Sequence, residues 1–190
     1  DDIPRLRLWR PDQVRWGVPL YSSVPQVHDR IVAKAGAFTR LEHGLDVLLQ
    51  AGAAVELRTV VLQANAAEMP ALARHVASRL PFISVWAIMQ LEHIGFARKR
   101  WAGLYYDHDE DLAPSAGAVD TAWLNGVPVA LYNFPRCSVP ADYRRFAHAS
   151  ISDWKRRYLR ACDACSARSS CSGFFEWHPI QADDRGVKPL

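Results

Sequence analysis

The chain has no cysteine before residue 137, only 2 methionines in 190 residues, and no apolar run of the roughly 18 to 20 residues that a membrane span needs. No signal-peptide pattern opens it either. The chain also has no large excess of either charge, because its 23 Lys and Arg residues are nearly balanced by 20 Asp and Glu residues. These absences exclude a membrane-spanning segment and a strongly basic domain. They predict a soluble protein of the reducing cytoplasm, where thiols stay available for metal binding.

The length and the hydrophobic content of the chain suit one folded domain. Hydrophobic residues make up 49% of the 190 residues, enough to bury one core, so a single domain with a small appendage is expected. The sequence opens on Asp1 without a methionine and continues at once with charged and apolar residues typical of a domain interior. We therefore expect it to be part of a longer protein.

The order of hydrophobic patterns predicts an α/β fold. Short apolar runs rich in β-branched and aromatic residues alternate with longer runs whose apolar residues recur at helical spacing. The expected strands cover 13–21, 54–62, 82–89 and 127–134, and the expected helices cover 27–50, 69–80 and 111–125. The first helix contains a break signal at Gly36, and Asn65 and Glu68 have capping-box spacing before the second. Such alternation favours right-handed crossovers and a parallel sheet, either a small open sheet or the later half of a (β/α) barrel.

Polar residues follow three of these strands at the point where each ends. Because sites in parallel sheets gather at the carboxyl ends of the strands, these residues are candidate ligand contacts. Each is also a common turn or helix-capping residue, so the two interpretations stay open. The candidates are Tyr21, Ser22 and Ser23 after the first strand, Gln63 and Asn65 after the second, and Gln90, Glu92 and His93 after the third.

Four cysteines form the clearest pattern for chemistry. Cys137, Cys162, Cys165 and Cys171 are separated by 24, 2 and 5 residues, which suits a closed thiolate site for an iron–sulfur cluster or zinc. Two disulfides, or a redox pair at Cys162 and Cys165, are the alternatives. A basic helix is expected over 142–160. We expect a metal-binding appendage over 135–180, with aromatic cover from Phe174, Phe175 and Trp177, and a loose tail over 181–190.

Two functions without catalysis are also compatible with these patterns. A zinc-stapled nucleic-acid-binding module would use the basic residues between Arg144 and Arg168 on phosphates, although the mild net charge of +3 makes nucleic acid a poor partner. A scaffold without catalysis is the other. The acidic stretch from Asp107 to Asp111 is expected to be a solvated loop rather than a magnesium site.

Two stretches resemble radical S-adenosylmethionine (SAM) enzymes, specifically the maturases of the His-Xaa-Ser peptide-modification system. The run from Val18 to Asp29 resembles their fourth-strand exit, commonly Ser-Leu-Asp-Gly followed by His-Asp. The run from Leu131 to Cys137, continued through the other cysteines to Trp177, resembles their cysteine-bearing SPASM-like or twitch-like extension. The segments around Arg58 and Glu92 are also similar, so the resemblance covers nearly the whole chain.

The resemblance implies a fold, cofactors and partners. Residues 1–134 would be the later half of a partial (β/α) barrel, and the cysteines would hold an auxiliary [4Fe–4S] cluster. The SAM contacts that it implies are Ser22, Ser23, Arg58, Asn65 and Glu92. The complete enzyme would use SAM and a second [4Fe–4S] cluster to modify a ribosomally made precursor peptide, with an electron donor and a partner maturase.

The sequence also departs from that family. The three cysteines spaced by three and two residues that hold the SAM cluster are absent. The common Ser-Leu-Asp-Gly is replaced by Leu20, Tyr21, Ser22 and Ser23, so the ribose contact is not fixed. We therefore expect this chain alone to be inactive toward SAM.

Overall fold

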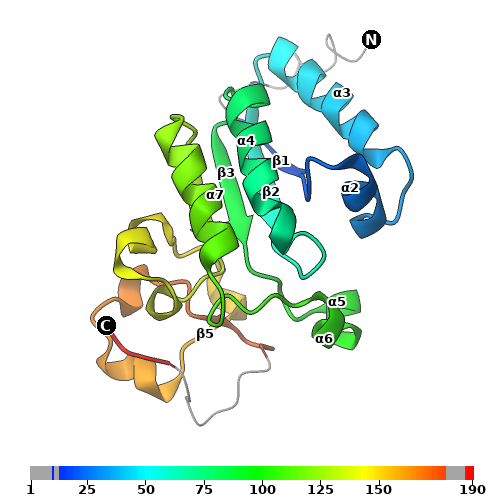
Figure 1. Ribbon diagram of the computed structural model, residues 1–190. Helices are drawn as coiled ribbons and strands as arrows, with labels where there is room; N and C mark the ends of the chain where they lie inside the picture. The colour runs from blue at the N-terminus through cyan, green and yellow to red at the C-terminus, as the bar shows by residue number, and fades with distance from the viewer. Residues whose placement is uncertain (1–9, 11–12, 179–186) are drawn as a thin grey trace.

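The computed structural model describes residues 10, 13–178 and 187–190. Its centre is a four-stranded parallel sheet in the order β1-β2-β3-β4 (Figure 1). The strands are β1 (Arg15–Pro19), β2 (Ala54–Val60), β3 (Val85–Met89) and β4 (Val129–Tyr132). The predicted α/β class and the parallel sheet are thus confirmed; β1 and β4 are shorter than expected at both ends, β2 only at its end and β3 only at its start.

Helices follow the strands as the alternating pattern predicts. They are α2 (Pro25–Ile31), α3 (Ala37–Gln50), α4 (Met69–Arg79), α5 (Gly95–Lys99), α6 (Trp101–Leu104) and α7 (Ala113–Leu124). Short 3-10 turns are η1 (Ala66–Glu68), η2 (Arg136–Ser138), η3 (Ala141–Phe146), η4 (Asp153–Lys155), η5 (Arg160–Ala164) and η6 (Arg168–Ser170). In the part of the chain that the structure describes, none of these helices is long and apolar enough to cross a membrane.

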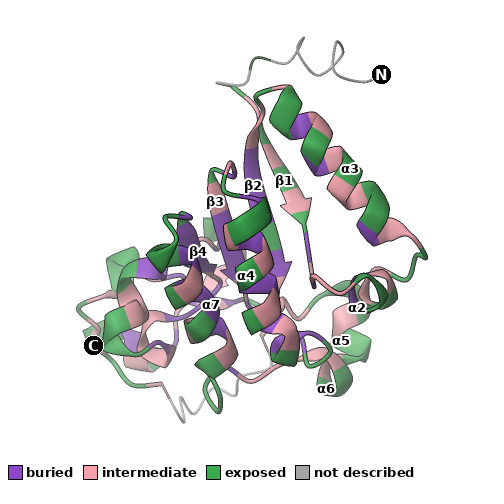
Figure 2. Ribbon diagram, turned by 45° about the horizontal axis from the view of Figure 1, so that its top comes forward, coloured by how far each residue is buried: buried purple, intermediate pink, exposed green. Residues whose placement is uncertain are grey.

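One face of the sheet carries the core. Successive strand residues point to opposite faces, and Val55, Leu57 and Thr59 of β2 are fully buried. Helices α3, α4 and α7 lie against this face and share its hydrophobic cluster (Figure 2). Thr59 completes the packing, because its hydroxyl donates to the Leu20 carbonyl and accepts the Trp86 indole N–H.

The opposite face of the sheet carries no α-helix among the described residues. On this bare face the side chains of Arg15 and Arg58 are 60% and 51% exposed. Parallel sheets normally have both faces covered. The outer edge of β1 also pairs with no strand in the described ranges, so this side of the sheet is open.

The helix expected over 27–50 is two helices. The chain breaks at Gly36, whose φ of 69° lies in the left-handed region that glycine tolerates. The Asp29 carboxylate accepts hydrogen bonds from the backbone N–H groups of Gly36 and Phe38, at 2.8 Å for Phe38. Asp29, at the end of α2, therefore fixes the start of α3.

The basic helix expected over 142–160 is wrong. Only η3 and η4 form there, and Arg156–Arg157 is instead strand β5, paired antiparallel with β6 (Phe174–Phe175). Between the two turns, Ala147 bridges to Leu131 at the outer edge of β4. The His148 N–H then donates to the Leu131 carbonyl at 3.2 Å. Long-range backbone pairing thus prevails over the helical composition of this segment.

Candidate functional site

The carboxyl ends of β1 and β2 are joined by Asn65. Its side-chain oxygen accepts the Leu62 N–H at 2.7 Å, and its amide nitrogen donates to the carbonyls of Tyr21 and Val60 at 2.8 and 3.1 Å. Asn65 is fully buried, so these bonds occupy it. It does not form the predicted capping box with Glu68, because its side chain bonds the preceding loop instead of the helix start. Asn65 is thus a structural latch between the two strand ends, and both hydrogens of its side-chain amide bond backbone carbonyls.

The two candidate serines after β1 differ in accessibility. Ser22 is fully buried, and its hydroxyl accepts the Val24 N–H at 2.9 Å in a local turn. Ser23 is half-buried. The same loop is held by His28, whose Nδ1 accepts the Tyr21 N–H at 3.3 Å. Burial lowers the pKa of His28, which keeps the ring neutral and able to accept that bond.

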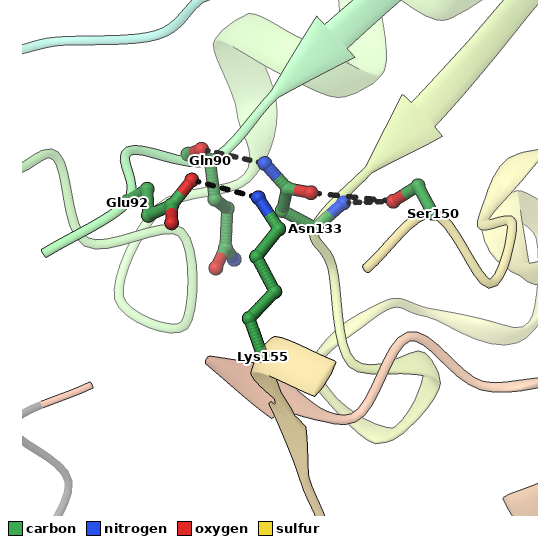
Figure 3. A network of polar contacts seen from close by, with 5 residues as sticks. All are labelled: Gln90, Glu92, Asn133, Ser150 and Lys155. Carbon is green, nitrogen blue, oxygen red and sulfur yellow. Dashed lines mark hydrogen bonds and ion pairs between the residues drawn. The ribbon is translucent and has the colours of Figure 1, made fainter. Parts of the chain in front are cut away.

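A polar network joins the carboxyl ends of β3 and β4 to the cysteine-bearing extension (Figure 3). Asn133 donates from its side chain to the Gln90 carbonyl at 3.2 Å, and its backbone N–H donates to the Ser150 hydroxyl at 2.7 Å. The Ser150 hydroxyl lies 3.3 Å from the Ser172 hydroxyl, and the Ser150 N–H donates to the Ser172 hydroxyl at 3.2 Å. Ser172 lies next to Cys171, so the network connects the sheet edge to the cysteines.

Glu92 forms the second link between the sheet and the extension. Its carboxylate pairs with the Lys155 ammonium at 3.2 Å, as Figure 3 shows, and both side chains are about a quarter exposed. The ammonium also lies over the Phe175 ring, 5.1 Å from its centroid. Nearby, the Nδ1 atom of His93 lies 2.9 Å from the Trp177 carbonyl. Two of the candidate residues after β3 therefore hold the extension against the carboxyl edge.

Arg58, the remaining predicted SAM contact, lies on the bare face rather than at the strand end. Its guanidinium pairs with the Glu56 carboxylate at 2.6 Å and covers Gly17, where an added Cβ would meet the guanidinium carbon at 3.1 Å. Glu56 is 6% exposed. Because half of the Arg58 side chain is exposed, one side of its guanidinium can still receive an anionic group.

All four cysteines line one cavity in the extension. No disulfide joins them. Two backbone N–H groups donate to the Cys171 sulfur, from Arg136 at 3.3 Å and from Gly173 at 3.4 Å. Gly173 has a φ of 63°, and a Cβ there would lie 2.8 Å from the Arg157 carbonyl oxygen, so only glycine brings this N–H to the sulfur.

The end of the chain closes this cavity. The last four described residues belong to the segment expected to be a loose tail, of which 181–186 lie outside the described residues. Val187, Pro189 and Leu190 line the cavity, and the Leu190 N–H donates to the Cys165 sulfur at 3.4 Å. Both the backbone N–H and the hydroxyl of Ser166 donate to Leu190, at 2.9 and 2.8 Å. Residues 187–190 are thus held by hydrogen bonds over the thiols.

Zinc and iron–sulfur clusters place different geometric demands on four thiolates. Among the described residues, no group of three or more His, Cys, Asp or Glu side chains is placed to hold one metal ion. A mononuclear zinc site needs each sulfur about 2.3 Å from the same atom. In a four-iron cluster each thiolate binds a different iron atom, so the sulfurs stand farther apart around one cavity. Three N–H donors on sulfur suit thiolate ligands of that kind.

The Cys137 thiol has a raised pKa. Burial, and then the neighbouring Cys171, raise the pKa of Cys137 to about 11, and Cys162 acts in the same direction. These influences show that the three sulfurs are close enough to interact. At neutral pH the Cys137 thiol keeps its proton unless a positive group replaces it.

Many basic residues of the extension are already engaged. Arg136 donates to the Ser170 hydroxyl at 2.6 Å and to the Arg144 carbonyl, and Arg144 donates to the Val139 carbonyl. Arg168 pairs with Asp163 at 2.8 Å. These contacts leave less free positive charge for phosphates than the basic sequence indicates, which weighs against a nucleic-acid interface.

Sequence reasoning missed the residues that connect the two parts. Asn133, Ser150 and Lys155 were not among the candidates. Asn133 carried a usable signal, because it follows a strand directly and asparagine tolerates the left-handed φ of 68° found here. No sequence signal pointed to Ser150 and Lys155, because their partners are distant in the sequence.

In comparisons with known proteins, no family model matches this chain, and no curated protein matches it either. What the site can do is therefore judged from its own residues and geometry.

Proposed function

We propose that this chain is part of a radical SAM enzyme that modifies a ribosomally made precursor peptide, and that its four cysteines hold an auxiliary [4Fe–4S] cluster. One observation carries the proposal. Thiols distant in sequence gather around one cavity, in an extension fastened to the carboxyl ends of a parallel sheet. Carboxyl ends are where parallel sheets of this kind place their chemistry.

The open side of the sheet supports a barrel origin. Four parallel strands with helices on one face make a section of barrel wall, and the bare face with Arg58 and Glu56 would face the barrel interior. We propose that the complete enzyme supplies the remaining strands, the SAM cluster and the SAM-binding contacts of the other half. An electron donor, the precursor peptide and a partner maturase are the expected partners.

The residues around the cavity have defined tasks in this proposal. Cys137, Cys162, Cys165 and Cys171 would be the ligands, and the N–H groups of Arg136, Gly173 and Leu190 would stabilise the negative charge on sulfur. When bound, such a cluster supplies one-electron transfer or structural support. Phe174, Pro189 and Leu190 keep water from the sulfurs, and the Glu92–Lys155 pair keeps the extension at the sheet edge.

Metal analysis of anaerobically purified protein tests the proposal. We expect a brown protein that absorbs near 400 nm and contains about four iron and four sulfide per chain. Cys162→Ala should lose most of the iron, whereas Ser166→Ala, directly after the ligand Cys165 but not itself a thiol, should keep it. A colourless protein with stoichiometric zinc would contradict the iron–sulfur assignment and support the zinc-stapled module.

Activity separates the auxiliary site from the SAM site. Reconstituted with dithionite and SAM, this chain alone should release no 5′-deoxyadenosine, whereas a longer form bearing the three-cysteine motif should. In that longer form, Cys162→Ala should spare SAM cleavage and abolish peptide modification. Equal loss of both would show that the cysteine site mainly supports folding.

A further inference from the structure

A hollow of about 660 Å³ lies over the bare face near the starts of β3 and β4. Its size is within the range of about 300 to 1,000 Å³ that is usual for ligand pockets. Val85, Pro128 and Ala130 form part of its floor, and Trp123, at the end of α7, forms part of its wall. It is separate from the cysteine cavity, with which it shares no lining residue.

A guanidinium in contact with two aromatic rings forms one wall of the hollow. Arg145 lies 4.9 Å from the Trp123 ring centroid and 4.7 Å from that of Phe146, and the two rings meet edge to face at 5.5 Å. These cation–π contacts hold the guanidinium in place and leave its N–H groups for another partner. Among the described residues, no carboxylate pairs with Arg145.

The other polar side chains of the hollow also favour an anion. Arg15 and His148 line it together with Arg145, and Ser84 and Tyr132 add hydroxyl groups. No Asp or Glu lines it. Glu56, a carboxylate of β2 on this face, is bound by Arg58 at 2.6 Å and lies 3.9 Å from Arg15. Two guanidiniums therefore face one hollow with little compensating charge.

We propose that this hollow binds an acidic segment of a peptide, with carboxylate side chains on Arg145 and Arg15 and an apolar side chain on the Val85, Pro128 and Ala130 floor. A mixed floor and rim suit a peptide better than a nucleic-acid strand, whose continuous phosphate backbone would pass the buried Glu56 carboxylate. The choice of a peptide rests on the proposed function, because the enzyme's substrate would be a precursor peptide. The site would hold an acidic part of that precursor away from the reacting residue.

Fluorescence anisotropy on the whole chain tests this site. The probes are a short labelled peptide that alternates glutamate with leucine and glycine, a matched peptide with glutamine in place of glutamate, and an oligothymidylate of the same charge. No SAM, reductant or metal is added, so binding is judged apart from the proposed chemistry. We expect the glutamate peptide to bind best and its affinity to fall as salt is raised.

Variants locate the binding. Arg145→Gln should weaken binding of the glutamate peptide about five- to tenfold, and Arg145→Lys less, because lysine keeps the charge but cannot bind a carboxylate in the two-point manner of a guanidinium. Arg74→Gln makes the same charge change on the exposed face of α4, on the other side of the sheet. This control variant should bind the glutamate peptide as tightly as the unmodified chain. Thermal melts confirm folding of each variant. Equal binding of the glutamine peptide, tighter binding of the oligothymidylate, or equal losses in the Arg74 and Arg145 variants would each overturn the proposal.

Discussion

At the scale of single residues, the polar side chains at the strand ends divide into two kinds. Asn65 and Ser22 are fully buried, and their polar atoms bond the loops that carry them. Glu92 and Arg58 are part-exposed and bound through charges that a ligand can compete for. Residue type alone does not separate the two kinds, because an asparagine after a strand serves a loop or a ligand equally well.

Replacing the Asn65 side chain tests whether it acts as a latch between the strand ends. Asn65→Ala would leave the Leu62 N–H and the Tyr21 and Val60 carbonyls without their partner, at a cost of about 2 to 3 kcal/mol in the free energy of unfolding. Urea denaturation measures this loss. Asn125→Ala is the control, because Asn125 is exposed and bonds only the Thr121 carbonyl, and it should cost below about 1 kcal/mol. Equal effects of the two substitutions would contradict a latch.

At the scale of elements, the best-predicted segments are those with a strong period. Helix α7 was expected over 111–125 and spans Ala113–Leu124, and the parallel order of the strands followed from the alternation with helices. The segment after β4 was predicted wrongly as a basic helix over 142–160, because its conformation is set by partners far along the chain. Ala147 bridges to Leu131 of β4, and Ser150 bonds Asn133 and Ser172, contacts that no local pattern shows.

Residues 187–190 belong to the segment expected to be a loose tail, and they contact the cysteine cavity. Their backbone bonds to Cys165 and Ser166 cover the thiols. Removing residues 187–190 should therefore raise the rate at which a thiol reagent modifies the metal-free protein, by about tenfold or more, because local protection depends on such contacts. Ser166→Ala, which removes one of the two bonds to Leu190, should have a smaller effect in the same direction. Unchanged rates in both variants would show that this segment does not shield the cysteines.

At the scale of the whole molecule, the sheet divides the protein into a packed half and an open half. Helices α3, α4 and α7 bury one face, whereas the other carries exposed arginines and the hollow. The extension joins the rest of the protein through polar contacts of Asn133, Glu92 and His93 at the carboxyl ends of the strands. It is also anchored by Val139, Phe146 and Ala147, which belong to the hydrophobic core. Polar and apolar contacts together therefore position the cysteine site.

The stability of the whole fold should also depend on pH through a buried histidine. His108 is 2% exposed and packs against Phe134 at 4.7 Å between ring centroids, and burial lowers its pKa to about 4. The unfolded chain takes up this proton near pH 6.5, well before the folded chain does. The folded state is thus favoured above pH 6.5, and that advantage is lost as the pH falls from about 6.5 to about 4, by roughly 3 kcal/mol in all.

Denaturation measured across this pH range checks the assignment. His108→Leu cannot take up the proton, so its unfolding free energy should fall less steeply between pH 6.5 and 4 than that of the unmodified chain, whatever the packing change does to its absolute value. His178, whose pKa burial also lowers to about 4, should leave part of the slope in place. His43→Gln, on the exposed side of α3, should keep the full slope. If His108→Leu also kept the full slope, the neutral His108 ring would not be what makes the fold sensitive to acid.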